Sequence, residues 1–276
     1  MRGNAELARW GRETLADARA VFVGSAHIRE VLEAVVGHVD RVYEVPPGVD
    51  VETFRPELRP AALRKLLEEA VRDQPNPENA NERLPDEGNA ERLDAFLAEE
   101  APTVLYFGKL IRNKGVHLLL QALERVDARA VIVGFGDYRE ELERQAAGLD
   151  ALFTGPFEHR HLVHLLALAD VAAAPSIFPE AFGMVAAEAA ACGVFPVSAA
   201  HSGLAEVTRA LAAEVPEQAR PWLDFEVGDG AVRDLASSLI SWLQAPEDVR
   251  EATRAGIVEV VREKYSWEGL ARTVVA

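Results

Sequence analysis

Apolar runs and helical stripes alternate along most of the chain. From Thr103 onward, each of five short apolar runs is followed by a stretch in which apolar residues recur at helical spacing. The runs predict strands at 104–107, 130–133, 151–154, 171–174 and 194–197, and the stripes predict helices at 116–125, 138–147, 161–169, 185–191 and 204–213. This alternation indicates an α/β fold with a doubly wound parallel sheet and helices on both faces. Ligands of such sheets bind beyond the carboxyl ends of the strands, so the loops there are where chemistry is expected.

The first 50 residues carry a shorter version of the same pattern. Residues 5–19 predict an amphipathic helix, and the apolar run at 20–24 predicts a buried strand. Ser25 can cap the helix that follows, and the run at 42–45 predicts another strand. The turn Pro46-Pro47-Gly48 ends that strand.

Residues 57–101 differ in composition from the rest of the chain. They hold 12 Asp or Glu against 6 Lys or Arg, and the stretch 73–89 is polar, contains prolines and lacks periodicity. We interpret that stretch as an exposed or partly disordered insertion. Helical spacing predicts further helices at 61–72, at 91–100 and over most of 230–276. Trp242 and Trp267 are the expected packing anchors of the C-terminal helices.

Composition narrows the class of protein. The net charge of −16 argues against a general nucleic-acid binder, because neutralising phosphates needs a basic surface. A few local cations can still hold one anionic ligand. No run of about 18 apolar residues predicts a transmembrane segment, and the N-terminus lacks the apolar core of a secretory signal. The single cysteine, Cys192, is expected to be a small buried residue and fits a reducing cytoplasm.

The loop after the strand at 104–107 runs from Gly108 to Gly115 and opens a helix. Gly108 allows close approach of the backbone, and Lys109 and Lys114 bring two cations toward the helix N-terminus. Together these features suit a diphosphate. The alternative is a solvated basic turn, which the spacing by itself favours.

Glycine turns follow the next two strands. Gly134-Phe135-Gly136-Asp137 lacks the third glycine of a dinucleotide fingerprint, so a tight turn that lets a helix begin is favoured, although its backbone can still approach a ligand. The turn Gly155-Pro156-Phe157-Glu158 can lie against a base. A plain strand-to-helix connection is an equal alternative there.

The most informative loop follows the strand at 171–174. It contains Glu180, then an aromatic residue and a glycine, and a helix begins after them. Glu188 lies within that otherwise apolar helix, where a buried carboxylate needs a partner. Two ligand hydroxyls or a nearby Lys or Arg would each serve. The backbone amides at the helix start are free donors for phosphate or sugar oxygens, namely those of Phe182, Gly183, Met184 and Val185.

Several histidines invite other interpretations. His159, His161 and His164 lie close together, but no cysteine or carboxylate completes a metal geometry, so no metal site is expected. We interpret His161 and His164 as helix-surface residues. The pair His201-Ser202 lacks a nucleophile elbow, and turn and cap duties are favoured for it.

These loops, in their order, resemble a known family. The segments GKLIRNKG, VGFGDYREELE and PEAFGMVAAEAAACG are similar to the C-terminal domain of retaining GT-B glycosyltransferases of family 4, the glycosyl transferases group 1, and VPPGVDVETFRP resembles the segment that enters this domain. The resemblance covers about residues 20–56 and 103–276. Its specific part is the spacing of Glu180 and Glu188 in that context, whereas the glycine turns are not specific. It implies a Rossmann-like sheet, the GT-B C-terminal domain, and a glycosyltransferase activity.

The resemblance implies a role for each matching residue. Lys109, where the family usually has Arg, and Lys114 would neutralise the donor diphosphate, and Glu188 would bind the ribose hydroxyls. Glu180 would face the donor sugar as the catalytic residue. The other implied donor-binding residues are Gly108, Phe157 beside the base, and the amides around Phe182, Gly183, Met184 and Val185. Such enzymes use a nucleotide sugar, here UDP-, GDP- or ADP-linked, retain the anomeric configuration and need no metal or other cofactor.

The family also has an entire N-terminal domain, with acceptor-site residues, before this region. Here only about 45 residues precede Gly48. We therefore expect 1–47 to be a remnant of the N-terminal acceptor domain, 48–265 to be the donor domain with an acidic insertion at about 57–101, and 266–276 to be a C-terminal helix. The missing domain would then be a partner required for hexosyl transfer. Two alternatives stay open: a non-catalytic nucleotide-binding or assembly module, and a nucleotide-sugar epimerase or phosphorylase of the same fold.

Overall fold

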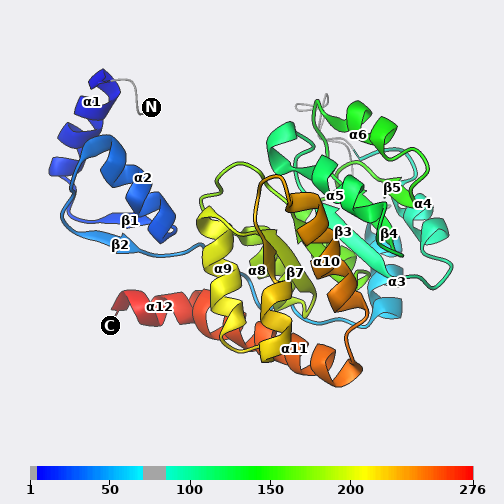
Figure 1. Ribbon diagram of the computed structural model, residues 1–276. Helices are drawn as coiled ribbons and strands as arrows, with labels where there is room; N and C mark the ends of the chain where they lie inside the picture. Colours follow the sequence, from blue (N-terminus) through cyan, green and yellow to red (C-terminus); the bar gives the residue numbers. More distant parts are fainter. Residues whose placement is uncertain (1–4, 71–84, 276) are drawn as a thin grey trace.

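A six-stranded parallel sheet forms the centre of the molecule (Figure 1). The computed structural model describes residues 5–70 and 85–275. The strands, in chain order, are β3 (Thr103–Phe107), β4 (Arg129–Val133), β5 (Ala151–Phe153), β6 (Val171–Ala174), β7 (Phe195–Ala199) and β8 (Asp224–Phe225). Across the sheet they run β5-β4-β3-β6-β7-β8. The predicted parallel sheet is confirmed, and the two-residue β8 at its edge is the one strand of this sheet that the sequence pattern missed.

The chain adds strands to the sheet in two opposite directions, starting from the middle. From β3 the chain moves outward through β4 to β5, and it then returns to β6 and moves outward on the other side. The loops that leave β3 and β6 therefore diverge and open a crevice at the carboxyl edge. This reversal brings the loop at 108–115 next to the loop at 175–183.

Helices cover both faces of the sheet. On one face α5 and α10 pack against one another, and on the other α8 packs against β6 and β7 (Figure 1). The α-helices that follow β3 are α5 (Val116–Leu123), α6 (Arg139–Gln145), α7 (Leu162–Ala167), α8 (Met184–Ala191), α9 (Ser202–Ala212), α10 (Ala231–Leu243), α11 (Glu247–Val260) and α12 (Trp267–Val275). Shorter turns of helix are η2 (Arg112–Lys114), η3 (His159–His161), η4 (Glu217–Trp222) and η5 (Val261–Tyr265). None of the helices within 5–70 and 85–275 has the length and apolar character needed to cross a membrane.

The acidic region contributes two helices to the core. They are α3 (Arg59–Ala70) and α4 (Asn89–Phe96), whose Leu66 and Leu93 are almost completely buried. Most of the polar stretch expected to be exposed falls on 71–84, outside the described residues. At its described end Asn89 is buried, contrary to that expectation, because α4 begins there and the Asn89 side chain bonds the Pro156 carbonyl in the turn after β5.

The interpretation of His161 and His164 as surface residues is wrong. Both are buried, because α3 packs across α7 and covers them. His164 Nδ1 lies 2.7 Å from Glu57 Oε2, and its Nε2 lies 3.7 Å from Glu69 Oε2. The periodicity of a helix shows which residues share a face, but not which distant segment covers that face.

Residues 5–44 form a smaller unit beside the main body (Figure 1). It consists of α1 (Ala5–Ala16), β1 (Val21–Val23), α2 (Ala26–Val36) and β2 (Val42–Glu44), with β1 and β2 paired in parallel. Ser25 caps α2 as predicted, because its side chain accepts a hydrogen bond from Ile28 N at 3.2 Å. The prediction that 20–24 form a buried strand is wrong for Phe22, whose side chain is 61% exposed.

Hydrogen bonds join the smaller unit to the main body. Glu206 of α9 accepts from the amides of Ala26 and His27, at 3.0 and 2.9 Å, at the start of α2. Ser25 Oγ donates to the Ala181 carbonyl at 2.6 Å. The start of α2 is thereby attached directly to the loop that carries Glu180.

The two tryptophans expected as packing anchors differ in their surroundings. Trp242 is buried, stacked on Phe195 with ring centroids 4.1 Å apart. Trp267 is 65% exposed, so the expectation is wrong for it. It starts α12, which leaves the main body toward the smaller unit, and its ring lies over Gly48, where a Cβ would come within 2.5 Å of it.

Candidate functional site

A cavity of about 580 Å³ opens at the carboxyl edge of the sheet, over the reversal between β3 and β6. Its walls are the loops after β3 and β6, the start of α8 and Pro47 of the segment that joins the two units. Eight of the predicted site residues line it: Gly108, Lys109, Lys114, Glu180, Phe182, Gly183, Met184 and Val185. Phe157 and Glu188 are not among the lining residues.

The loop after β3 places its two lysines in this cavity. Gly108 N donates to the Val133 carbonyl at 3.0 Å, and the Tyr106 hydroxyl donates to the Lys109 carbonyl at 2.8 Å. Burial raises the pKa of Tyr106, and the nearby Glu180 carboxylate raises it further, so the phenol keeps the proton that it donates. Only four lysines occur in the chain, and two of them stand in this loop. The cavity therefore gains a cationic wall in a protein of strongly negative net charge.

The two glycines of the turn after β4 allow it to pack closely against the backbone of the loop after β3. A Cβ at Gly134 would lie 1.8 Å from the Gly108 carbonyl oxygen, and one at Gly136 would lie 2.2 Å from that of Leu110. Both glycines have φ near +150°. These close approaches are made to protein backbone, which agrees with the favoured interpretation of a structural turn.

Glu180 and Lys114 form an ion pair across the cavity, with Oε1 and Nζ 2.5 Å apart. Both side chains remain partly exposed, at 25% and 32%. A ligand that entered the cavity would meet a lysine and a glutamate already held together, and Lys109 beside them.

Residues of α9 fix the loop that carries Glu180. Ser202 Oγ accepts from Glu180 N at 2.9 Å, and Gly203 N donates to the Glu180 carbonyl at 3.0 Å. His201 Nε2 bonds the Ser176 carbonyl at 2.7 Å. The sequence pointed to turn and cap duties for His201-Ser202, but it gave no signal that the turn they hold would be the one bearing Glu180, about 20 residues earlier.

Glu188 is buried in α8, with 5% of its surface exposed. Its partner is His159, whose Nε2 lies 3.0 Å from Glu188 Oε1, so the alternative of a Lys or Arg partner is not what the structure shows. Burial raises the pKa of Glu188, and the hydrogen bond and charge of His159 oppose this rise. The pair joins α8 to the turn after β5, the turn that contains Phe157.

The start of α8 supplies backbone donors. Its N-cap is Gly183, which makes no side-chain capping bond, and the described residues provide no acceptor for the amides of Met184 and Val185. Free amides and the positive end of the helix dipole favour an anionic or polar ligand oxygen. Across the described ranges, no three His, Cys, Asp or Glu side chains come together as a group that could hold a metal ion.

The order of the strands defines a Rossmann-like α/β domain. The cavity with its two lysines lies where that order reverses between β3 and β6, which is the usual place for a ligand crevice in such domains. Within that class, the chain belongs to the glycosyl transferases group 1 family, whose profile matches residues 89–256. The family membership that the sequence resemblance indicated is thereby confirmed.

Named relatives support this assignment. The chain is 35% identical over 211 residues to D-inositol 3-phosphate glycosyltransferase of Xylanimonas cellulosilytica, a match that covers 71% of this chain and 44% of that protein. It is 31% identical over 237 residues to the GDP-mannose-dependent monoacylated alpha-(1-6)-phosphatidylinositol monomannoside mannosyltransferase of Corynebacterium glutamicum, covering 81% and 52%. The chain thus spans about half the length of these two relatives.

Solved structures share the fold. Sucrose-phosphate synthase from Thermosynechococcus elongatus matches with a TM-score of 0.70 at 22% identity, over 99% of this chain and 60% of that one. Anabaena HepE, solved in complex with UDP and glucose, matches with a TM-score of 0.72 at 19% identity, over 100% and 66%. These likenesses show the fold alone, which confirms the predicted fold class.

Proposed function

We propose that the chain is the donor-binding half of a retaining glycosyltransferase that transfers a hexosyl group from a nucleotide sugar. The observation that carries this proposal is the cavity over the β3–β6 reversal, where Lys109, Lys114 and the start of α8 surround Glu180. Two cations and a helix N-terminus suit a diphosphate, and the adjacent carboxylate suits sugar hydroxyls.

Each group takes a part in the proposed donor complex. Lys109 and Lys114 bind the diphosphate, and the amides of Gly183 and Met184 bind phosphate or sugar oxygens. Glu180 faces the donor sugar, so Lys114 exchanges its present ion pair with Glu180 for a shared position between carboxylate and phosphate. The nucleoside end reaches Glu188 for the ribose hydroxyls and Phe157 for the base, with Gly108 allowing close approach of the backbone.

Transfer breaks the bond between the anomeric carbon and the diphosphate oxygen. Negative charge grows on that oxygen, and the two lysines and the helix dipole stabilise it without a metal ion. The acceptor hydroxyl attacks from the same face through an oxocarbenium-like state, so the anomeric configuration is retained. Lysine in place of the usual arginine at 109 keeps the charge and gives up bidentate geometry.

Names of relatives indicate which donors to test first. The Corynebacterium relative is called GDP-mannose-dependent, and HepE was solved with UDP and glucose. We propose a UDP-, GDP- or ADP-linked sugar as the donor. The only cysteine, Cys192, is buried and free, which supports a cytoplasmic location.

The division of the chain is also part of the proposal. Residues 1–47 are proposed to belong to an acceptor-binding N-terminal domain, 48–265 to be the donor domain with its acidic insertion at 57–101, and 266–276 to be a C-terminal helix. In support, Trp10, Phe22 and Tyr43 of the smaller unit are each more than half exposed. Within the described residues β1 and β2 pair only with each other. Such apolar surface suits contact with the rest of a domain.

Calorimetric titration of the chain with UDP, GDP and ADP tests the proposal. Binding of at least one nucleotide is expected, and no heat from any of them at millimolar concentration contradicts it. Transfer is tested with a protein that also contains an N-terminal acceptor domain. Its product should carry the anomeric configuration of the donor, which the anomeric proton coupling in NMR reports, and an inverted product contradicts the retaining mechanism.

A further inference from the structure

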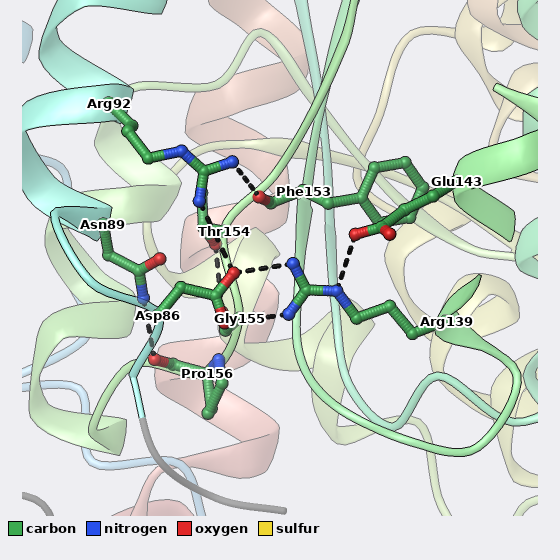
Figure 2. Close-up of polar contacts among 9 residues, drawn as sticks. All are labelled: Asp86, Asn89, Arg92, Arg139, Glu143, Phe153, Thr154, Gly155 and Pro156. Carbon is green, nitrogen blue, oxygen red and sulfur yellow. Dashed lines mark hydrogen bonds and ion pairs between the residues drawn. The ribbon is translucent and has the colours of Figure 1, made fainter. Parts of the chain in front are cut away.

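Asp86 is tied to the first residue of α6 (Figure 2). It accepts two hydrogen bonds from the Arg139 guanidinium, at 2.9 Å on Oδ1 and 2.6 Å on Oδ2. A bidentate carboxylate–guanidinium pair fixes orientation as well as distance. Since α6 starts directly after the glycine turn that follows β4, this pair holds Asp86 at the carboxyl edge of the sheet.

The Asp86 carboxylate also lies against the turn after β5. Gly155 in that turn has a φ of +66°, and a Cβ there would come within 2.4 Å of Asp86 Oδ1. The Asp86 carboxylate therefore occupies the space that a side chain at position 155 would need. Asp86 is in contact with the turns after β4 and β5 at once.

Two side chains of α4 hold the same turn by its carbonyls (Figure 2). Asn89 donates to the Pro156 carbonyl at 3.3 Å, and Arg92 donates to the Phe153 carbonyl at 2.8 Å. Asn89 is buried, so its contact is shielded from water. The segment 85–96 is thus bonded to the residues on either side of Gly155.

The nucleoside end of the proposed donor would lie on this turn. The cationic cavity is over β3 and β6, and Glu188, one turn along α8 from it, faces His159 of the loop after β5. A ligand with its diphosphate at Lys109 and its ribose at Glu188 extends toward β5. Its base then reaches the Gly155–Phe157 turn.

The diphosphate end is fixed by other contacts. Gly108 is held by Val133, and Lys109 by the Tyr106 hydroxyl, and neither contact involves the segment 85–96. The turn after β4 touches the backbone of Gly108 and Leu110. Because neither Asp86 nor Arg139 bonds the two lysines, changes at Asp86 should affect the base end of the site more than the lysines.

We propose that Asp86, through Arg139, is a positioning residue that sets the nucleobase end of the donor site and its selectivity among nucleobases. This inference rests on the proposed function. The Asp86–Arg139 pair fixes the turn after β5, on which the base would lie, relative to the start of α6, and it makes no bond to Lys109 or Lys114.

The test compares nucleotides with inorganic pyrophosphate. Wild type, Asp86→Asn and Glu143→Gln are titrated with UDP, GDP, ADP and pyrophosphate. Glu143 is the matched control, because its carboxylate also bonds Arg139, at 2.7 Å, but makes no hydrogen bond to either turn. Asp86→Asn should lower the affinity for the best-bound nucleoside diphosphate about tenfold, and the affinities for UDP, GDP and ADP should become more alike. The affinity for pyrophosphate should change less than about twofold. Glu143→Gln should change none of these affinities.

Arg139→Gln removes the same pair from the other side and leaves Asp86 itself unchanged. This variant should also lose affinity for nucleoside diphosphates more than for pyrophosphate. It therefore tests the inference even if Asp86→Asn fails to fold. An equal loss for pyrophosphate and nucleotides, or unchanged nucleotide affinity in either variant, overturns the inference. If the wild type binds none of the nucleotides, the proposed function itself fails and the inference fails with it.

Discussion

Glu188 and His159 meet at 3.0 Å, although one lies inside α8 and the other on the turn after β5. The carboxylate is almost completely buried among alanines, whereas the imidazole side chain is 69% exposed. The imidazole ring rests on Phe54, with ring centroids 5.3 Å apart. A ligand can displace an exposed partner, so this pair leaves a buried carboxylate available for hydroxyl groups.

Glu188→Gln should stabilise the protein and weaken donor binding. Burial raises the pKa of Glu188, so folding disfavours its ionised form and stability falls as pH rises through the folded-state pKa. Glutamine removes that charge, and we expect a melting temperature about 2–4 °C higher at pH 8. Nucleotide affinity should fall about tenfold or more, because a hydrogen bond to a charged acceptor is lost.

Thermal melts and calorimetry of Glu188→Gln measure both effects. The stability gain should vanish below pH 4, where the wild-type carboxyl is itself protonated. His159→Ala is the companion variant and should lower the melting temperature at pH 7, since it leaves the carboxylate without its partner. A lower melting temperature in Glu188→Gln at pH 8 would show that the His159 contact outweighs the effect of burial.

Lys109→Ala should lower the affinity for both pyrophosphate and nucleoside diphosphates by about tenfold. The reason is the loss of one of two cations in the cavity. Lys264→Ala is the control, because it removes the same charge from an exposed lysine that lies outside the site. Titrations at two salt concentrations should also show a weaker salt dependence in Lys109→Ala. Equal effects of the two variants would mean that net charge, and not the site, governs binding.

Gly115→Ala should destabilise the protein by about 3 kcal/mol or more. Gly115 has a φ of +68°, and a Cβ there would lie 1.8 Å from the Pro175 carbonyl oxygen. Gly148→Ala separates the two causes, because Gly148 has a φ of +93° and nothing within 4 Å of its Cβ position. That variant should lose only about 1 kcal/mol, measured by urea unfolding. Similar losses in both would show that the loop after β3 moves away from Pro175 at little cost.

Glu57→Gln should make the fold less sensitive to acid. Burial opposes ionisation of Glu57, but bonds from Lys65 and His164 outweigh it and hold the pKa below its ordinary value. The ionised form therefore stabilises the fold above the pKa of the unfolded carboxyl, and this stabilisation is lost as pH falls through the folded-state pKa.

At pH 7 the free energy of unfolding of Glu57→Gln should be lower by about 1–2 kcal/mol. Its decline between about pH 6 and pH 3 should be shallower than in wild type. Glu69→Gln is the control, because Glu69 is 41% exposed and lies 3.6 Å or more from both buried histidines. Unfolding in urea across this pH range measures the free energy of unfolding of each variant. If that free energy changes with pH in the same way in wild type and Glu57→Gln, ionised Glu57 does not stabilise the fold.

Local pattern was sufficient for most of the sheet, whereas the family resemblance was needed to predict the cationic cavity. Strands β3 to β7 are short apolar runs bounded by turn residues, so their position depends on neighbours in sequence. Parallel strands place their following loops at one edge, so chemistry was expected there. The family resemblance then assigned Lys109, Lys114 and Glu180 to one donor site. Strand β8, with only two residues and no run of its own, had no such signal.

Tertiary structure alone decided which segments cover and bond these local features. Helix α3 buries His161 and His164, the loop after β5 gives Glu188 its histidine partner, and α9 fixes the loop of Glu180. Asp86 meets Arg139 across 53 residues of sequence. Such contacts depend on the path of the whole chain and on side-chain directions, neither of which is encoded in a period of two or 3.6 residues. The sequence therefore determined the order of the elements and the chemistry of the loops, and the fold determined the partners.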